Sequence, residues 1–361
     1  MWSVIGQARA VALLQRGLEK GSLAHAYLLV GPAQVGKMTL ALDLARALNC
    51  EAAEPPFGEA QGRPCGECLS CQKITSAKHA DVQIIGLSHN GDSEEAKLKT
   101  EISIDQIRQV QHSASLPPFE GKYKVFIIDG AELLSIEAAN CLLKTLEEPI
   151  GKAVFILLTT NERLLPTTVV SRCQRVELHP VPFAEIETAL NRNRGVEPEK
   201  ARLLAKLSRG CPGWAISASL DDSLLQQRAE RLDRLLTLIS ADAEERFTYA
   251  AQLAAQFGQN RGLVQEELNL WLDWWRDLLL VKAGLIDNIT NIDRLDSLSD
   301  LAGGYTLAQI RASIDSLLMA WEQLKQNANP RLVLEVLMLD MPEAEERHDK
   351  VTTAQFEVKY D

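Results

Sequence analysis

Short apolar runs alternate with stretches of helical periodicity along the first half of the chain. Each run is four or five residues long and lacks polar side chains, apart from one glutamine, as in strands buried on both faces of a parallel sheet. The runs occupy residues 26–30, 82–85, 125–128 and 154–158. Helical spacing is evident at residues 7–20, 37–49 and 135–148. This alternation predicts an α/β domain whose parallel sheet is covered by helices on both faces.

The pattern becomes entirely helical after Pro180. Short helices are predicted at residues 183–193, 198–208 and 213–220, separated by glycine and proline. Longer ones follow at residues 223–239, 243–256, 261–283, 306–326 and 330–339. We therefore expect an α/β domain over residues 1–180, a small helical domain over 181–220, a larger all-α domain over 221–341 and a polar tail at 342–361.

A phosphate-binding pattern, Gly-x-x-x-x-Gly-Lys, begins at Gly31, after the first predicted strand and before a helix. Backbone N–H groups of such a loop and the N-terminus of its helix bind anions, and Lys37 adds a positive charge. Gly31, Gly36, Lys37 and Thr39 are therefore candidate nucleotide-binding residues. A glycine-rich turn that holds no ligand is the alternative interpretation of this pattern.

Residues needed for ATP hydrolysis depart from this pattern. Met38 occupies the position whose Ser or Thr hydroxyl helps to bind Mg²⁺, and a thioether is a poor ligand for a hard cation. Thr39 comes one residue later, about 100° further round the helix. Asp129, at the end of an apolar run, is a candidate to face Mg²⁺. Gly130 stands where many proteins that hydrolyse nucleotides with this phosphate loop carry a catalytic Glu. ATP and Mg²⁺ are thus doubtful cofactors.

Four cysteines have the spacing of a metal site. Cys65, Cys68 and Cys71 follow one another at intervals of three, and Cys50 lies 15 positions before them. In a reducing compartment this set fits a closed, structural Zn²⁺ site with four sulfur ligands within residues 50–71. Unconnected thiols and an iron–sulfur cluster are the alternatives.

Composition and charge narrow the classes of function. Hydrophobic residues make up 46% and charged residues 24%, as in ordinary globular proteins. The net charge is −11, and residues 221–361 carry all of it, with 14 basic and 25 acidic side chains. A protein that grips DNA unaided is usually basic, so this balance argues against an autonomous DNA-binding protein. The absence of a long apolar segment and of a signal-like start predicts a cytoplasmic protein without a membrane partner.

An ordered set of motifs resembles one protein family. The set comprises Ala-His-Ala-Tyr-Leu-Leu-Val-Gly-Pro at residues 24–32, the phosphate loop, the four cysteines, Leu-Leu-Lys-Thr-Leu-Glu-Glu-Pro at residues 142–149, and Ser171-Arg172-Cys173. Together they resemble the bacterial clamp-loader subunits of the DNA polymerase III holoenzyme, which are AAA+ proteins. The resemblance covers roughly residues 1–215. It implies an AAA+ domain, a helical lid domain at 181–220 and a helical collar, where subunits pack, at 221–341.

Within that family the departures favour the delta-prime type over the gamma/tau type of ATPase, which remains the alternative. Met38 replaces the Mg²⁺-binding hydroxyl and Gly130 the catalytic Glu. Residues 210–215 lack the nucleotide-sensing Arg of an ATPase member. The gamma/tau type is also usually longer than 361 residues. The resemblance then implies a component of a DNA-directed DNA polymerase that assists ATP-dependent loading of the sliding clamp on primed DNA, without ATPase activity of its own. The implied partners are gamma/tau and delta subunits in a hetero-pentamer and, through it, the clamp and primer–template DNA.

The resemblance gives Arg172 a catalytic role in trans. In the family, the Arg of Ser-Arg-Cys reaches into the ATP site of the neighbouring subunit, where it stabilises charge on the γ-phosphate. A surface Arg with a local salt bridge is the simpler reading. For Lys144, Glu147 and Glu148 the resemblance suggests subunit contact or a surface facing DNA, while an i,i+4 pair of Lys144 with Glu148 explains them equally well.

Two other classes of function compete with a clamp-loader subunit. One is an independent AAA+ ATPase, in which polar residues at the end of the run 157–161 orient the attacking water. The other is a zinc-bearing module that binds nucleic acid. Trp271, Trp274 and Trp275 share one predicted helix, and core packing is the default interpretation, with a subunit interface as the alternative.

Overall fold

The computed structural model describes residues 2–52, 64–87, 101–148 and 151–342. These residues form two compact units, 1–219 and from Leu220 onward. Three predicted features lie partly outside the described residues: the cysteine segment at residues 53–63, the Leu-Leu-Lys-Thr-Leu-Glu-Glu-Pro motif at Pro149, and the tail at residues 343–361. The fold class expected from the sequence is confirmed, with a parallel sheet in the first unit and helices throughout the second.

Five parallel strands form the sheet of the first unit, in the order β2-β3-β4-β1-β5. Their bounds are β1 Ala26–Val30, β2 Val82–Ile85, β3 Lys124–Asp129, β4 Ala153–Thr159 and β5 Gln174–Glu177. The four apolar runs are strands, as predicted. The sequence pattern missed β5, an edge strand in which Val176 is the buried residue, because it contains no apolar run.

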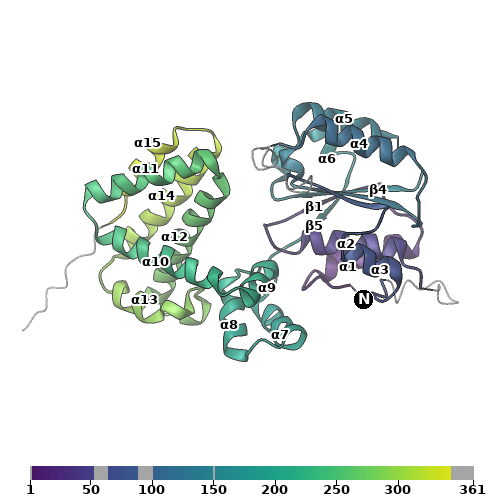
Figure 1. Ribbon diagram of the computed structural model, residues 1–361. Helices are drawn as coiled ribbons and strands as arrows, with labels where there is room; N and C mark the ends of the chain where they lie inside the picture. The colour runs from purple at the N-terminus through teal and green to yellow at the C-terminus, as the bar shows by residue number, and fades with distance from the viewer. Residues whose placement is uncertain (1, 53–63, 88–100, 149–150, 343–361) are drawn as a thin grey trace, which may run out of the picture. The chain divides into compact units, whose positions relative to one another are not determined.

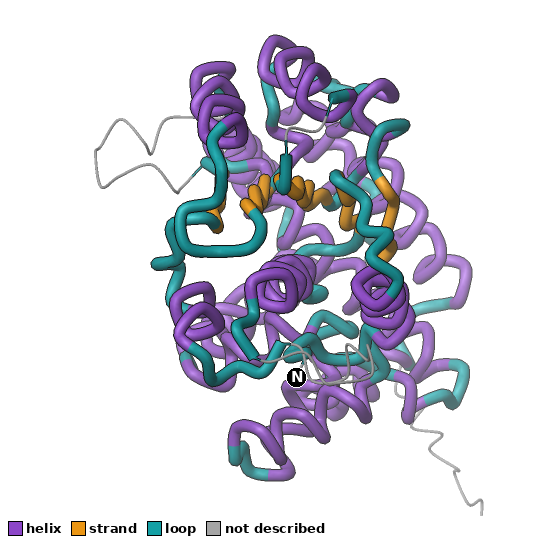
Figure 2. The backbone as a smooth tube through the Cα atoms, turned by 90° about the vertical axis from the view of Figure 1, so that its right-hand side faces the viewer, coloured by secondary structure: helices purple, strands orange, loops and turns teal. Residues whose placement is uncertain are grey.

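Helices cover both faces of this sheet. One face carries α1 Ala8–Glu19, α2 Lys37–Asn49 and α3 Leu69–Thr75; the other carries α4 Ile104–Ser115, α5 Ile136–Glu147 and α6 Thr167–Val170 (Figure 1). Figure 2 shows the strands as a layer between these helices. Alternate residues of each strand enter opposite cores: Leu28 packs with α4 and α5, and Leu29 with α1 and α2. Short 3₁₀ turns, η2 Ala131–Leu133 and η3 Glu162–Leu164, follow β3 and β4.

Three more helices complete the first unit: α7 Phe183–Arg194, α8 Pro198–Leu207 and α9 Pro212–Leu220. Their ends coincide with the predicted breakers, since Gly195 adopts a left-handed conformation at the end of α7 and Pro198 is the first residue of α8.

The second unit is a bundle around one apolar core. Its helices are α10 Ser223–Ser240, α11 Ala243–Gln259, α12 Arg261–Lys282, α13 Leu295–Ala302, α14 Leu307–Lys325 and α15 Pro330–Leu339, with 3₁₀ turns η4 Ile286–Asn288 and η5 Ile292–Arg294. Trp271, Trp274 and Trp275 of α12 are fully buried in that core, so the core-packing interpretation is confirmed. Among the described residues, no helix is both long and apolar enough to cross a bilayer.

Candidate functional site

The candidate nucleotide site lies where β1, β3 and β4 end together. The parallel register places Val30 opposite Thr159, and Asp129 opposite Leu158. The carboxyl edge of an open α/β sheet is where such folds bind ligands. The structure therefore brings together the phosphate loop after β1, the exposed Asp129 at the end of β3 and the polar end of β4.

The phosphate loop has the backbone that its glycines predict. Gly36 has a φ of +111° at the N-terminus of α2, a conformation that other residues rarely adopt. A Cβ on Gly31 would lie 2.6 Å from the carbonyl oxygen of Leu178. Both glycines are thus required by the fold of the loop itself, with or without a ligand.

Lys37 turns back onto its own loop. Its Nζ donates hydrogen bonds to the carbonyl oxygens of Gly31, at 2.7 Å, and of Pro32, at 2.6 Å, and the side chain is buried. Burial lowers the pKa of Lys37, and the nearby carboxylates of Glu132 and Asp129 partly oppose this shift. The ammonium group therefore satisfies carbonyl groups of the loop at the position where it would otherwise meet phosphates.

Residue 38, where the phosphate-loop pattern expects a Ser or Thr hydroxyl, has none. The Met38 side chain packs against the apolar core formed with α1 and α2. Glu132, in η2, is engaged elsewhere: its Oε1 accepts hydrogen bonds from Thr160 N at 3.0 Å and from Thr160 Oγ1 at 2.6 Å. The polar end of β4 is thereby used to fix the turn after β3.

The start of α9 contacts the phosphate loop directly. Gly213 N donates a 2.9 Å hydrogen bond to the carbonyl oxygen of Gln34, which has a φ of +58°. A Cβ on Gly213 would lie 2.8 Å from that oxygen, so only glycine allows this approach. Burial raises the pKa of the Cys211 thiol, while Arg209 and Lys37 act in the opposite direction. A glycine contact thus occupies the place where the sequence lacks a nucleotide-sensing Arg.

The four cysteines converge on one point. Their sulfur atoms all lie within 4.8 Å of one another, and those of Cys65 and Cys71 are 3.9 Å apart. A tetrahedron with Zn–S bonds of about 2.3 Å places its sulfur atoms about 3.8 Å apart, so the set fits zinc. Cys50 ends α2 and is buried, as is Cys71 in α3. The cluster therefore joins α2 to the segment before α3.

Backbone groups also prepare this cluster for a metal ion. Cys68 N donates to Cys65 Sγ at 3.3 Å, and Cys71 N donates to Cys68 Sγ at 3.5 Å. Bonds of this kind, from the N–H groups of Cys68 and Glu67, lower the pKa of Cys65 to about 6, whereas burial raises that of Cys71. One thiolate is thus already favoured without the ion.

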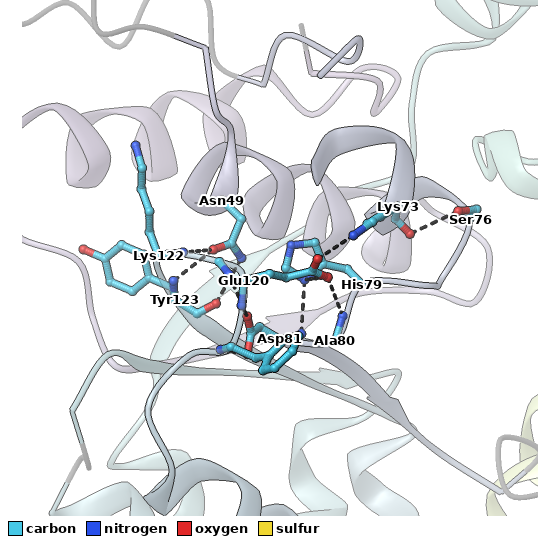
Figure 3. A network of polar contacts seen from close by, with 11 residues as sticks. Asn49, Lys73, Ser76, His79, Ala80, Asp81, Glu120, Lys122 and Tyr123 are labelled. Carbon is cyan, nitrogen blue, oxygen red and sulfur yellow. Dashed lines mark hydrogen bonds and ion pairs between the residues drawn. The ribbon is translucent and has the colours of Figure 1, made fainter. Parts of the chain in front are cut away.

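A polar network ties the cysteine module to the sheet (Figure 3). Asn49, next to Cys50, accepts hydrogen bonds at its Oδ1 from Lys122 N at 2.8 Å and Tyr123 N at 2.9 Å. Asp81, before β2, accepts from the backbone N–H groups of residues 119–121 at 2.7–2.8 Å. Burial opposes ionisation of Asp81, but these three bonds and the positive charge of Lys124 together lower its pKa. Sequence patterns did not reveal either residue, since isolated Asn and Asp carry no spacing signal.

Arg172 lies on the surface, just after α6. Its Nη1 donates to the carbonyl oxygen of Thr168 at 2.8 Å, and its Nη2 forms an ion pair with the Glu147 carboxylate. Glu147 is the last residue of α5. The local salt bridge that the sequence offered as the simpler reading of Arg172 is therefore present, although its partner was not predicted. The side chain of Arg172 is one-third exposed, at 33%.

Family models match both halves of the chain. The one described as "DNA polymerase III, delta subunit" matches residues 6–182, and the one described as "DNA polymerase III, delta subunit, C terminal" matches residues 223–343.

Individual proteins resemble the chain over most of its length. DNA polymerase III subunit delta' of Bacillus subtilis is 29% identical over 93% of this chain and 96% of its own length. Subunit tau of the same organism is also 29% identical, over 99% of this chain but 66% of its own length, so the chain spans just under two thirds of that relative. The solved structure of a gamma subunit-related protein of DNA polymerase III from Thermotoga maritima aligns with 91% of this chain and 97% of its own, at 18% identity and a TM-score of 0.36.

Proposed function

The chain belongs to the DNA polymerase III family that includes subunits delta', tau and gamma, and on that premise we propose that it is a delta-prime-like clamp-loader subunit. It assists ATP-dependent loading of the sliding clamp on primed DNA without hydrolysing ATP itself. Its partners are gamma/tau and delta subunits in a hetero-pentamer, with clamp and DNA engaged through the complex in the cytoplasm.

One observation carries the proposal: the Met38 side chain, partly buried, packs against the apolar core at the position where a hydrolytic subunit needs a hydroxyl for its Mg²⁺. Glu132 cannot readily replace the missing base at residue 130, because its carboxylate holds Thr160. Gly31, Gly36, Lys37, Thr39 and Asp129 then form a remnant of a nucleotide site.

Arg172 supplies catalysis to another chain in this proposal. Bound ATP and Mg²⁺ in a neighbouring subunit provide the reacting phosphate, and Arg172 neutralises the charge that develops on it. Its partial exposure, just after the short helix α6, is compatible with such reach.

The test is to assemble the loader with its other subunits and to measure single-turnover ATP hydrolysis. Arg172→Ala should slow the site that this residue completes about 10³- to 10⁵-fold, whereas Arg163→Ala, an exposed Arg nearby, should not. An unchanged rate in the Arg172 variant contradicts the trans role.

A gamma/tau-type ATPase is the second candidate, favoured by the identity with tau over almost the whole chain. Lys37→Ala distinguishes the two. A delta-prime-like subunit should leave hydrolysis by the assembled loader unchanged, because its own loop does not turn over ATP. A gamma/tau-type subunit should lose hydrolysis at its own site.

The four cysteines are proposed to bind one structural Zn²⁺, whose chemistry here is to cross-link α2 to the segment before α3. Cys50, Cys65, Cys68 and Cys71 leave no coordination position open for a substrate. Metal analysis of the reduced protein should give one zinc per chain, and Cys71→Ser should lose it, while Cys141→Ser should retain it. Less than one equivalent in the unmodified protein defeats this assignment.

A further inference from the structure

The guanidinium of Arg172 binds groups of its own subunit. The guanidinium binds one main-chain carbonyl, that of Thr168, one hydroxyl, that of Ser171 at 3.4 Å, and the carboxylate of Glu147. Glu147 is half exposed, at 50%, so water reaches both ion-pair partners. An anion from outside the chain can therefore compete for the same guanidinium.

The backbone beneath Arg172 is anchored. Val169 of α6 is fully buried in the core beneath α5, and Cys173 packs against the same core. Arg172 N donates to the carbonyl oxygen of Val169 at 3.2 Å, which continues the turn of α6. Any change in the reach of Arg172 must then come from its side-chain torsions, and the contacts of the guanidinium decide where it rests.

We propose that Glu147 is a positioning residue that keeps Arg172 withdrawn until an anionic ligand of a neighbouring subunit, a nucleotide phosphate, displaces it. The inference rests on the trans role of Arg172 proposed above. A carboxylate and a phosphate compete for the same fork of N–H donors, and a guanidinium binds either of them in the same planar geometry. On release, the Arg172 guanidinium therefore exchanges a carboxylate partner for a phosphate partner and is never left as an unpaired cation.

The strength of the pair suits a reversible restraint. Ion pairs exposed to this degree shift an equilibrium by about two- to five-fold, because water screens the charges and ordering the side chains costs entropy. A pair of this strength favours the withdrawn position of Arg172 when no nucleotide is present. It is weaker than the interaction of Arg172 with a multiply charged phosphate held in the neighbouring subunit. A buried pair would lock Arg172 instead.

The experiment uses the assembled loader and single-turnover ATP hydrolysis without DNA, comparing wild type with Glu147→Gln. Glutamine keeps the shape but removes the charge, so Arg172 should be free more often and the rate should rise about two- to five-fold. The ATP concentration that gives the half-maximal rate should fall or stay the same and should not rise, because the carboxylate no longer competes with the phosphate for Arg172. Glu137→Gln, at the opposite end of α5 and also exposed, is the matched control and should behave as wild type.

The double variant Glu147→Gln/Arg172→Ala should match Arg172→Ala alone, because Glu147 acts through Arg172. A Glu147→Gln rate equal to or below that of wild type overturns the proposal, as does a double variant that is faster than Arg172→Ala. If Arg172→Ala itself hydrolyses at the wild-type rate, the trans role fails and the proposal fails with it. If Arg172→Ala hydrolyses ATP slowly while Glu147→Gln hydrolyses it at the wild-type rate, the restraint by Glu147 is refuted and the trans role of Arg172 stands.

Discussion

Asp81 offers a quantitative test of how the segment before β3 is fixed to the start of β2. Its carboxylate accepts one hydrogen bond at Oδ1, from Phe119 N, and two at Oδ2, from the N–H groups of Glu120 and Gly121. Asp81→Ala removes all three bonds. Asp81→Asn keeps two if the amide oxygen takes the place of Oδ2, but its NH₂ group then faces the N–H of Phe119.

The expected loss follows from these contacts. Hydrogen bonds to a charged acceptor contribute about 1.5–3 kcal/mol each, but Phe119 and Glu120 are exposed, so water replaces part of what is lost. We therefore expect Asp81→Ala to destabilise the first unit by about 3–5 kcal/mol and Asp81→Asn by about 1–2 kcal/mol. Asp105→Asn, which removes an exposed charge, should cost less than about 0.5 kcal/mol.

Native-state hydrogen exchange of the β3 amides measures this loss within the first unit alone. At about 1.4 kcal/mol for each tenfold change, Asp81→Ala should accelerate their exchange at least 100-fold. The lowered pKa adds a signature: the stabilisation is full above about pH 4 and declines as the pH falls through the folded-state pKa. The difference between wild type and Asp81→Asn should therefore shrink below pH 4. If β3 exchanges alike in Asp81→Ala and Asp105→Asn, the carboxylate does not organise this loop.

Two further predictions concern the second unit, and both are measured by urea unfolding followed by the fluorescence of its buried tryptophans. Arg246 is buried and donates hydrogen bonds to carbonyl oxygens near the ends of α10 and α15, those of Leu238, Ile239, Met338 and Met341. Arg246→Leu should therefore lower the free energy of unfolding by about 3–5 kcal/mol. A loss below about 1 kcal/mol contradicts this prediction. Burial raises the pKa of Glu267, so its ionisation costs stability as the pH rises above about 4. Glu267→Gln should flatten this dependence, and an unaltered pH profile would refute the assignment.

Much of the fold could be predicted because its signals are local. The strands at residues 26–30 and 125–128 are found as expected, since all their residues are buried and a strand buried on both faces must be apolar throughout. The helices α3, α4 and α13 were not identified individually, because each is short or adjoins a polar segment. The strand β5 was missed for a different reason: an edge strand may keep polar side chains on its open side.

The site was predictable in its residues but not in its contacts. Spacing alone identified the four cysteines, and their convergence within 4.8 Å bears out the cluster that their spacing implied. Spacing could not show that Lys37 would satisfy carbonyls of its own loop, or that Glu147, rather than Glu148, would be the paired carboxylate at the end of α5. Those contacts depend on side-chain directions set by tertiary packing.

The phosphate loop illustrates why a motif and an activity must be argued separately. Gly31 is required by the nearby carbonyl of Leu178, and Gly213 by that of Gln34, so packing alone demands glycine at both positions. The ammonium of Lys37 likewise has two carbonyl partners within the protein. These three residues therefore have structural reasons to be what they are, whether or not a nucleotide binds. The chemistry of hydrolysis depends instead on residues such as residue 38, and there a partly buried thioether packs against the apolar core.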